Sequence, residues 1–269
     1  MKRSLHDPDL SPAEIRELVQ LGHDINERGM TGMTVLQSAV AAQNPATVKA
    51  VLEAGADVDS TYSRTNHFKD GTSNVYVGSA LQDACSGSSP EIVSLLIKAG
   101  ANVDKHADKT ETTPLMVAAL CGRAENIHLL LEAGAKVNVR NKAGFTALHC
   151  AVRGLTASGL PDEQSTKAVE AMVRAGADVT AKDGRGNTPL HCAIDSPSVA
   201  ALLIKAGANL LAKNADGKTP IDLAREQEGR ALELLQSVPR HGELSKQWDR
   251  HAPNPAPART PKARGRDRW

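Results

Sequence analysis

Two histidine–cysteine pairs, His149-Cys150 and His191-Cys192, carry the side-chain types that could bind a metal ion. Imidazole nitrogen and thiolate sulfur are preferred ligands of tetrahedral zinc, at distances of about 2 Å. Adjacent residues of a helix point about 100° apart, so one pair cannot direct both side chains at one ion. Helices packed side by side lie about 8–10 Å apart, which is wide for a single shell of ligands. We therefore predict structural roles for both pairs and no metal site.

The other polar residues do not predict catalysis. The glycine-rich stretch Asp183–Gly186 lacks the following Lys-Ser/Thr of a phosphate-binding loop. The histidines of the repeat motifs are explained by packing, which leaves no candidate base for a nucleophile among them, so we expect neither an enzyme nor a cofactor. Four cysteines are expected to act as small buried hydrophobic residues, a use that fits a reducing compartment better than a disulfide framework. They are Cys85, Cys121, Cys150 and Cys192.

These residues belong to a pattern that recurs along the chain. The segment Thr188–Ala193 (TPLHCA) is followed by Ala206–Asn209 (AGAN). The first part returns at Thr34, Ser79, Thr113, Thr146 and Thr219, and the second around Gly55, Gly100, Gly134 and Gly176. From Thr113 to Gly134 the distance is 21 residues and from Gly134 to Thr146 it is 12, which together make a period of 33. This period and the Thr-Pro-Leu-His-x-Ala signature resemble the ankyrin repeat.

The resemblance covers about residues 10–238 and implies an all-α solenoid of helix–turn–helix repeats with β-hairpin fingers. We divide the chain into an N-terminal capping partial repeat (1–26), six repeats (27–238) with a C-terminal cap at about 211–238, and a tail (239–269). The resemblance also implies that the motif histidines form hydrogen bonds across repeats. It further implies a non-catalytic protein that binds another protein through its fingers and the concave face of its inner helices.

Two insertions interrupt the repeat. The first, at about residues 60–78, lengthens one finger and contains three of the six aromatic residues of the chain, Tyr62, Phe68 and Tyr76. Because aromatic side chains dominate interface hot spots, these three are candidate partner-binding residues. The alternative is that they pack on the chain's own repeats and fasten the finger. The second insertion, at about 154–165, is expected to be a mobile loop at the end of the helices opposite the fingers.

Basic residues recur at equivalent finger positions. Arg140 and Lys182 lie six residues before their motif threonines, while Lys142 and Arg185 lie four and three residues before them. Stacking of the repeats would align these residues in a stripe that attracts an acidic partner surface. Ordinary solvated finger tips are the alternative. We include the four residues in the candidate binding surface.

The tail at 239–269 carries eight Lys/Arg and three Asp/Glu with scattered prolines, and is expected to be disordered. A basic tail of this kind could bind nucleic acid, as in a nuclear regulatory factor, or have no dedicated partner. A secreted effector that mimics host ankyrin proteins is a further alternative by family analogy. No apolar run approaches the roughly 20 residues of a membrane span. We expect a monomeric cytoplasmic protein with no membrane contact.

Overall fold

The structure is a computed structural model that describes residues 4–7, 10–67, 73–87, 89–158, 162–228 and 230–237. The chain divides into two units, residues 1–235 and 236–269, and the repeats lie in the first. Phe68 and the predictions for the tail at 239–269 fall outside the described residues. None of the helices in the described ranges combines the length and the hydropathy that crossing a bilayer requires.

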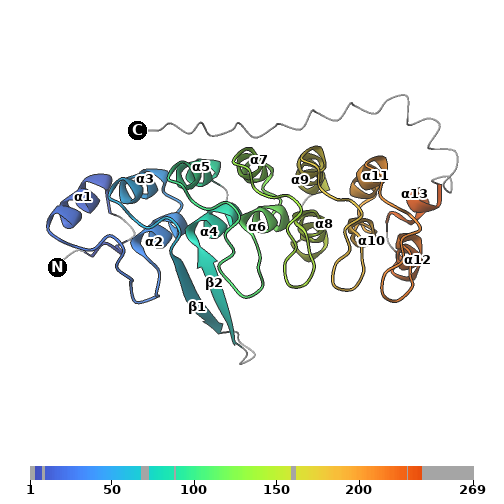
Figure 1. The fold of residues 1–269 in the computed structure, drawn as a ribbon, viewed down its shortest axis with the longest axis horizontal. Helices are drawn as coiled ribbons and strands as arrows, with labels where there is room; N and C mark the ends of the chain where they lie inside the picture. Colours follow the sequence, from blue (N-terminus) through green and yellow to red (C-terminus); the bar gives the residue numbers. More distant parts are fainter. Residues whose placement is uncertain are drawn as a thin grey trace, which may run out of the picture. The chain divides into compact units, whose positions relative to one another are not determined.

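The first unit contains an inner and an outer row of helices, with fingers below the inner row (Figure 1). The inner row consists of α2 (Val35–Ala41), α4 (Ala80–Ser86), α6 (Pro114–Leu120), α8 (Ala147–Ser158), α10 (Pro189–Cys192) and α12 (Pro220–Glu226). The outer row consists of α1 (Pro12–Gln20), α3 (Pro45–Glu53), α5 (Pro90–Lys98), α7 (Ala124–Glu132), α9 (Asp162–Arg174), α11 (Pro197–Lys205) and α13 (Leu232–Ser237). Helices pack within a repeat and against the adjacent repeat. This confirms the predicted all-α solenoid.

The inner helices begin at the motif hydroxyl residues because these residues cap them. The Thr34 hydroxyl accepts a hydrogen bond from the Gln37 backbone N–H, and the Gln37 side chain accepts one from the Thr34 backbone N–H at 2.8 Å. This reciprocal cap satisfies two donors that no helical carbonyl can reach. The same arrangement starts α1, α4, α10 and α12. Each repeat therefore specifies its own helix start locally.

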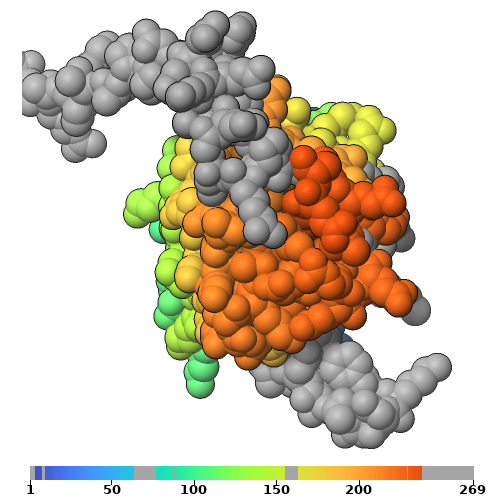
Figure 2. All heavy atoms as spheres, turned by 90° about the vertical axis from the view of Figure 1, so that its right-hand side faces the viewer, coloured from blue at the N-terminus to red at the C-terminus, as the bar shows by residue number. Residues whose placement is uncertain are grey.

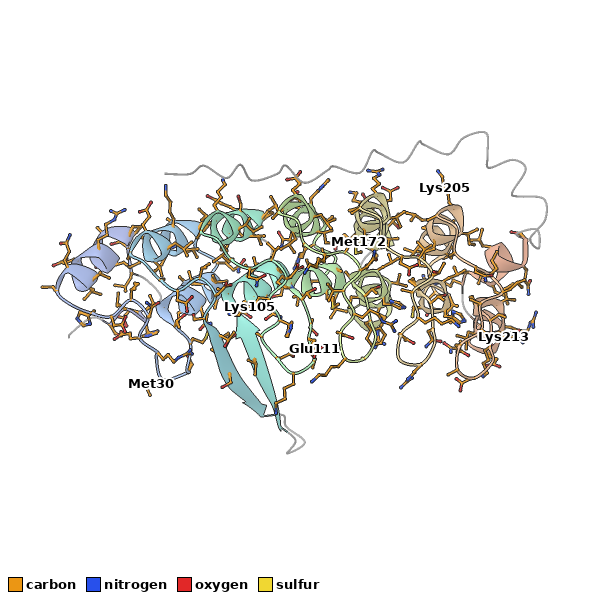
Figure 3. The ribbon with its side chains drawn as sticks, in the orientation of Figure 1. Met30, Lys105, Glu111, Met172, Lys205 and Lys213 are labelled. Atoms are coloured by element: carbon orange, nitrogen blue, oxygen red, sulfur yellow. The ribbon has the colours of Figure 1, made fainter. Side chains whose placement is uncertain are left out.

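Aliphatic side chains form the core in two layers. The motif leucine of each of the first five inner helices is at most 2% exposed: Leu36, Leu81, Leu115, Leu148 and Leu190. The outer helices contribute a second layer that is 0% exposed: Val51, Leu96, Leu130, Met172 and Leu203. Met172 lies between the two rows in Figure 3. Truncating one of the buried leucines to alanine would remove about 2–5 kcal/mol from the free energy of unfolding.

The first insertion forms an antiparallel hairpin of β1 (Thr61–His67) and β2 (Ser73–Ser79). Thr61 pairs with Ser79 at its base and His67 with Ser73 at its outer end. Figure 1 shows the hairpin leaving the stack on the same side as the other fingers and reaching farther from the helices than they do. The hairpin therefore makes the finger of the second repeat longer than the other fingers.

The second insertion differs from the mobile loop predicted for it. Most of residues 154–165 are helical, because α8 continues to Ser158 and α9 begins at Asp162. Gly154, which suggested a loop, is buried within α8. A glycine inside a helix costs only about 1 kcal/mol, and the packing of α8 against α6 and α9 offsets that cost. The insertion thus lengthens both helices of the fourth repeat.

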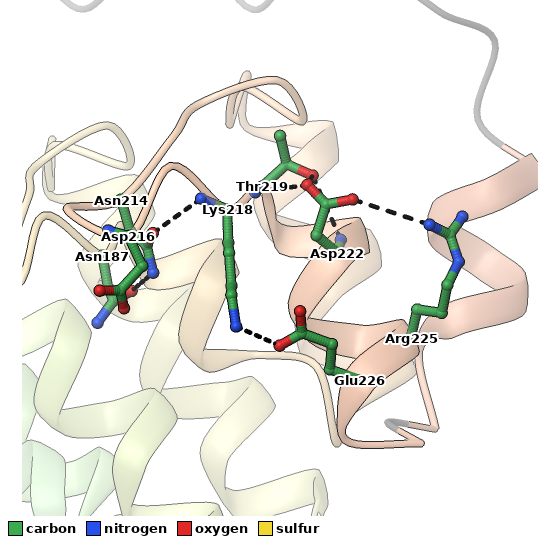
Figure 4. A network of polar contacts seen from close by, with 8 residues as sticks. All are labelled: Asn187, Asn214, Asp216, Lys218, Thr219, Asp222, Arg225 and Glu226. Atoms are coloured by element: carbon green, nitrogen blue, oxygen red, sulfur yellow. Dashed lines mark hydrogen bonds and ion pairs between the residues drawn. The ribbon is translucent and has the colours of Figure 1, made fainter.

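Polar residues surround the last inner helix at the C-terminal end of the repeats, which faces the viewer in Figure 2. The Lys218 backbone N–H donates to Oδ1 of Asn214 at 3.0 Å, and the Thr219 hydroxyl donates to Oδ2 of Asp222 at 2.7 Å. The Lys218 ammonium group pairs with Glu226, as Figure 4 shows. A stack needs terminal repeats with polar outer faces to stay in solution, and this network provides polar groups at that end.

Candidate interaction surface

The motif histidine of the fourth repeat joins two repeats. Nδ1 of His149 accepts hydrogen bonds from the Thr146 hydroxyl at 2.9 Å and from the Thr146 backbone N–H at 3.3 Å. The Nε2–H group donates to the backbone carbonyl of Asn187, in the finger of the fifth repeat, at 3.1 Å. These partners require the neutral tautomer with its proton on Nε2, because a backbone N–H can only donate. One ring therefore caps its own helix and holds the next finger.

We call this arrangement the clip: a side chain three residues after the motif hydroxyl accepts the backbone N–H of that residue and donates to a carbonyl of the following finger. The clip recurs in three other repeats. His191 donates from Nε2 to the Lys218 carbonyl at 3.1 Å. Gln37 and Gln82 donate from Nε2 to carbonyls of the fingers that follow them, at 2.9 and 2.7 Å. The bonds of His149 and His191 confirm the cross-repeat role implied by the family resemblance. Gln37 and Gln82 were not singled out from the sequence, although each follows a motif hydroxyl by three residues, as the histidines do.

The environment of the two histidine–cysteine pairs fits structural roles. Burial lowers the pKa of His149 and His191, against the opposing effect of their hydrogen bonds to backbone carbonyls. Burial raises the pKa of the Cys150 and Cys192 thiols to about 12, so both thiols are protonated near neutral pH. Within the part of the chain that the structure describes, no three His, Cys, Asp or Glu side chains are placed to hold a metal ion.

The third repeat has no clip, because Met116 stands at the clip position. Met116 is 1% exposed, and its helix has only the half of the cap that Thr113 supplies. We expect Met116→His to raise the free energy of unfolding by about 0.5–1.5 kcal/mol, since the ring would bond the Thr113 N–H and the Phe145 carbonyl. Urea denaturation against Met116→Leu, which has similar volume and no polar atom, measures this gain. Equal stability of the two variants would contradict it.

A second set of cross-repeat hydrogen bonds lies at the start of the fingers. Side-chain oxygens of four residues accept backbone N–H groups of the next repeat at 2.8–3.1 Å. The accepting residues are Asn26, Asp59, Asp104 and Asn138. Backbone bonds also join finger tips, from Gly184 N–H to the Ala143 carbonyl at 2.8 Å and from Ala215 N–H to the Arg185 carbonyl at 2.9 Å. The fingers are therefore a preformed surface rather than independent loops.

The four basic residues predicted to bind a partner are exposed on these fingers, and three of them also have contacts within the chain. The Arg140 guanidinium donates to the Lys182 carbonyl, and the Lys182 ammonium donates to a carbonyl of the following finger at 2.9 Å. The Lys142 ammonium lies 3.9 Å from Oε1 of Glu111. Arg185 is exposed beside them. Bonds to carbonyls do not neutralise Arg140 and Lys182, so the positive stripe persists, and its role in binding stays a prediction.

The aromatic residues of the hairpin have different surroundings. Tyr62 is 5% exposed at the base of β1, which favours the fastening alternative for this ring. Tyr76 pairs through its backbone with Arg64, while its side chain and all of Phe68 lie outside what the structure describes. A partner-binding role for Phe68 and Tyr76 stays a prediction.

An aromatic ring and a cation stand together near the inner face of the fourth repeat. The Arg153 guanidinium lies 4.5 Å from the ring centroid of Phe145, and that ring meets the His149 ring edge-on at 5.9 Å between centroids. Leu120, 39% exposed, occupies in the third repeat the place that Arg153 has in the fourth, seven residues after the motif threonine. We call Leu120, Phe145 and Arg153 the inner patch. Comparing equivalent positions between repeats would have found Leu120 and Arg153.

Comparison with known proteins places these repeats in a family. A family model for ankyrin repeats in three copies matches residues 81–183, and a model for ankyrin repeats in many copies matches residues 172–224. The chain is an ankyrin-repeat protein. Ankyrin repeats generally serve as protein–protein interaction modules and are typically non-catalytic.

Solved ankyrin-repeat domains share this fold. The ankyrin-repeat domain of Bcl-3, a member of the IkappaB protein family, aligns with a TM-score of 0.68 and 24% identity over 88% of this chain and 99% of that one. The domain of human ASB11 aligns with a TM-score of 0.67 and 24% identity over 89% and 100%. Protein PhlB of Serratia liquefaciens is 36% identical over 129 residues, which are 48% of this ankyrin-repeat chain and 52% of PhlB. The chain thus spans about half the length of this curated relative.

Proposed function

We propose that this ankyrin-repeat protein binds another protein, without catalysis, through the concave surface formed by its fingers and inner helices. The observation that carries the proposal is the stacking of exposed Arg153 on Phe145. Aromatic and arginine side chains supply much of the energy of protein interfaces, and a cation held over a ring is itself favourable. Because the two side chains already hold each other, binding would cost them little conformational freedom.

Charge supports an acidic partner surface. The exposed basic residues Arg140, Lys142, Lys182 and Arg185 lie on the fingers of the fourth and fifth repeats. Asp183, between the last two, is only 6% exposed, because its carboxylate accepts backbone N–H groups of its own finger at 2.8 Å. The accessible charge there is therefore mainly positive. An acidic surface would be attracted to these fingers and would meet the inner patch beside them.

Partner capture by the variant Phe145→Ala/Arg153→Ala tests the proposal. We expect at least about tenfold weaker retention of partners, because truncating a hot-spot residue costs about 2 kcal/mol or more. The matched control Arg16→Ala/Lys49→Ala removes two exposed cations from the outer helices α1 and α3, and should retain partners normally. Quantitative mass spectrometry of the proteins held by each immobilised chain makes the comparison.

Folding of the variants needs a separate check, because Phe145 is partly buried. Arg153→Glu leaves the ring in place and reverses the charge that faces the partner. It should weaken capture of an acidic partner while its urea denaturation midpoint stays close to that of the wild type. Proteins retained equally by the wild type, Arg153→Glu and Phe145→Ala/Arg153→Ala would show that the inner patch is not the binding surface.

A further inference from the structure

The register of the hairpin determines which of its backbone groups point away from it. The Thr61 carbonyl accepts a hydrogen bond from Nη2 of Arg28 at 2.9 Å, and the Ser79 N–H donates to the Gln82 side chain at 3.2 Å. The Thr61 carbonyl and the Ser79 N–H therefore point away from the partner strand, so Thr61 and Ser79 form a non-hydrogen-bonded pair. Hydrogen-bonded and non-hydrogen-bonded pairs alternate along two antiparallel strands. The N–H and C=O groups at positions 63, 65 and 67 of β1 and 73, 75 and 77 of β2 thus also point outward.

The two edges of the hairpin differ in what covers them. The finger of the first repeat, which contains Arg28 and Gly32, lies against β1. Arg28 donates to the Thr61 carbonyl, and a Cβ at Gly32 would lie 3.5 Å from the Ser63 carbonyl oxygen. No hydrogen bond from a described residue outside the hairpin reaches the backbone of Val77 in β2. Between Ser73 and Ser79 there is also no charged residue and no proline. Natural proteins usually protect an exposed edge strand with such residues, so the outward N–H and C=O of Val77 are open to a further strand.

We infer that an extended segment of the partner protein adds to β2 as the third strand of this sheet. The inference rests on the proposed function, in that the partner is a protein, and it specifies how the partner's chain is recognised. Outward backbone groups at positions 73, 75 and 77 recur about every 6.8 Å. A chain in the extended conformation matches that spacing, and strand addition of this kind obtains its affinity from main-chain hydrogen bonds.

Charge favours a foreign segment over a second copy of this chain. The finger next to β2, at 104–111, carries two Lys/Arg and three Asp/Glu. The two fingers that follow, at 136–142 and 178–185, carry five Lys/Arg and two Asp/Glu, and one of these two acidic residues, Asp183, is buried. A second hairpin pairing with β2 would bring another set of basic fingers to the same place. A segment with acidic residues on either side of its strand would instead be attracted there. The occupant is therefore an extended peptide with acidic flanks.

The variant Val75→Pro removes one outward N–H of β2 and leaves the bonds to β1 in place, because edge strands tolerate proline where the N–H faces outward. Val75→Thr is the matched control, since it keeps the N–H and the β-branched shape. The probe is a displayed library of random twelve-residue peptides selected on the full-length chain. For the selected peptides, we expect Val75→Pro to raise Kd about tenfold and Val75→Thr to change it less than about twofold.

Hydrogen exchange of the wild-type chain gives a readout that does not depend on how the proline variant folds. The N–H groups of Val75 and Val77 should exchange more slowly when a selected peptide is bound. The inference would be overturned if the selected peptides bound Val75→Pro and Val75→Thr equally. It would also be overturned if a bound peptide did not slow the exchange of the Val75 and Val77 N–H groups, or if the library gave no binders. A dimer of the chain alone that Val75→Pro abolishes would assign the edge to a second copy, and would also overturn it.

The test of strand addition to β2 can fail or succeed independently of the test of the inner patch. Peptides held by β2 alone should bind Phe145→Ala/Arg153→Ala as tightly as the wild type. Loss of peptide binding in Val75→Pro with no loss of protein capture in the inner-patch variants would support strand addition and contradict the inner patch. The opposite pair of results would support the inner patch and contradict strand addition.

Discussion

Replacing Gly144 with alanine is expected to lower the free energy of unfolding by about 2–5 kcal/mol and to loosen the contact between the fourth and fifth fingers. Gly144 has a φ of +77°, where a residue with a side chain costs about 1–2 kcal/mol. A Cβ there would also lie 2.7 Å from the backbone nitrogen of Gly184. Overpacking of this kind costs about 1–3 kcal/mol more. The added Cβ would displace the Gly184 N–H, which donates a hydrogen bond to the Ala143 carbonyl at 2.8 Å.

Gly134→Ala is the matched control for this substitution. Gly134 has a φ of +89°, but nothing lies within 4 Å of a Cβ added there. We expect Gly134→Ala to lower the free energy of unfolding only by the cost of the left-handed backbone conformation, about 1–2 kcal/mol. Both substitutions restrict the unfolded chain alike, so the difference between their urea denaturation curves measures the contact between the fingers. Equal losses would mean that the fingers separate at no cost and are not a preformed surface.

Acidification below about pH 6.5 is expected to destabilise the stack through two buried histidines. Burial lowers the pKa of His149 and His191 in the folded chain below the ordinary value of 6.5. The unfolded chain therefore binds protons at these rings that the folded chain does not. Their contribution to stability is complete above pH 6.5 and is lost as the pH falls through the folded-state pKa values. The limiting slope is about 1.4 kcal/mol per pH unit for each histidine.

Neighbouring charges modify this effect without reversing it. Around His149, the Asp183 carboxylate raises the pKa of the ring, while Arg140 and Arg153 lower it. Around His191, Lys182 lowers the pKa and Asp183 raises it. Protonation would also place a hydrogen on Nδ1, where each ring now accepts the hydroxyl and the backbone N–H of its motif threonine. The clip therefore depends on the neutral ring.

Glutamine provides a matched test, because Gln37 and Gln82 already form the clip without titrating. We expect His149→Gln/His191→Gln to keep most of its stability between pH 7.5 and pH 5.5, where the wild type loses more. His149→Ala/His191→Ala breaks both clips and should lose about 1–3 kcal/mol per site at either pH. Urea denaturation at the two pH values measures all three chains. A glutamine variant that loses as much stability on acidification as the wild type would assign the acid sensitivity to other groups.

Local features of the repeat were predictable from the sequence. Thr188, Leu190 and His191 each recur with a fixed spacing to their neighbours, and each acts within its own repeat or on the next one. One motif contains the cap and the core leucine together, so the linear pattern is sufficient to predict both, and Leu190 is buried as predicted. The cross-repeat bond of His191 was implied by the resemblance to ankyrin repeats, and the structure contains it.

Features that depend on distances between repeats could not be predicted in this way. The sequence left open whether Tyr62 contacts a partner or fastens the finger, and its burial at the base of the hairpin favours fastening. Arg140 and Lys182 look like free cations, but the spacing of the fingers brings each to a carbonyl of the next finger. Gly154 looks like a loop residue, but it lies within α8, because the packing of α8 against α6 and α9 outweighs the weak helix preference of glycine.

The sequence by itself determined that this chain forms a stack of two-helix repeats, because each repeat contacts only its neighbours and its period of 33 residues contains the signals for both helices. Only the tertiary structure decided which side chains the stack exposes. Phe145 and Arg153 are eight residues apart in the chain, yet the Arg153 guanidinium lies 4.5 Å from the Phe145 ring centroid, because Phe145 precedes α8 and Arg153 lies within it. Which backbone groups of β2 point outward likewise follows from the register of the hairpin, and the bond from Arg28 to Thr61 depends on how the first two repeats lie against one another.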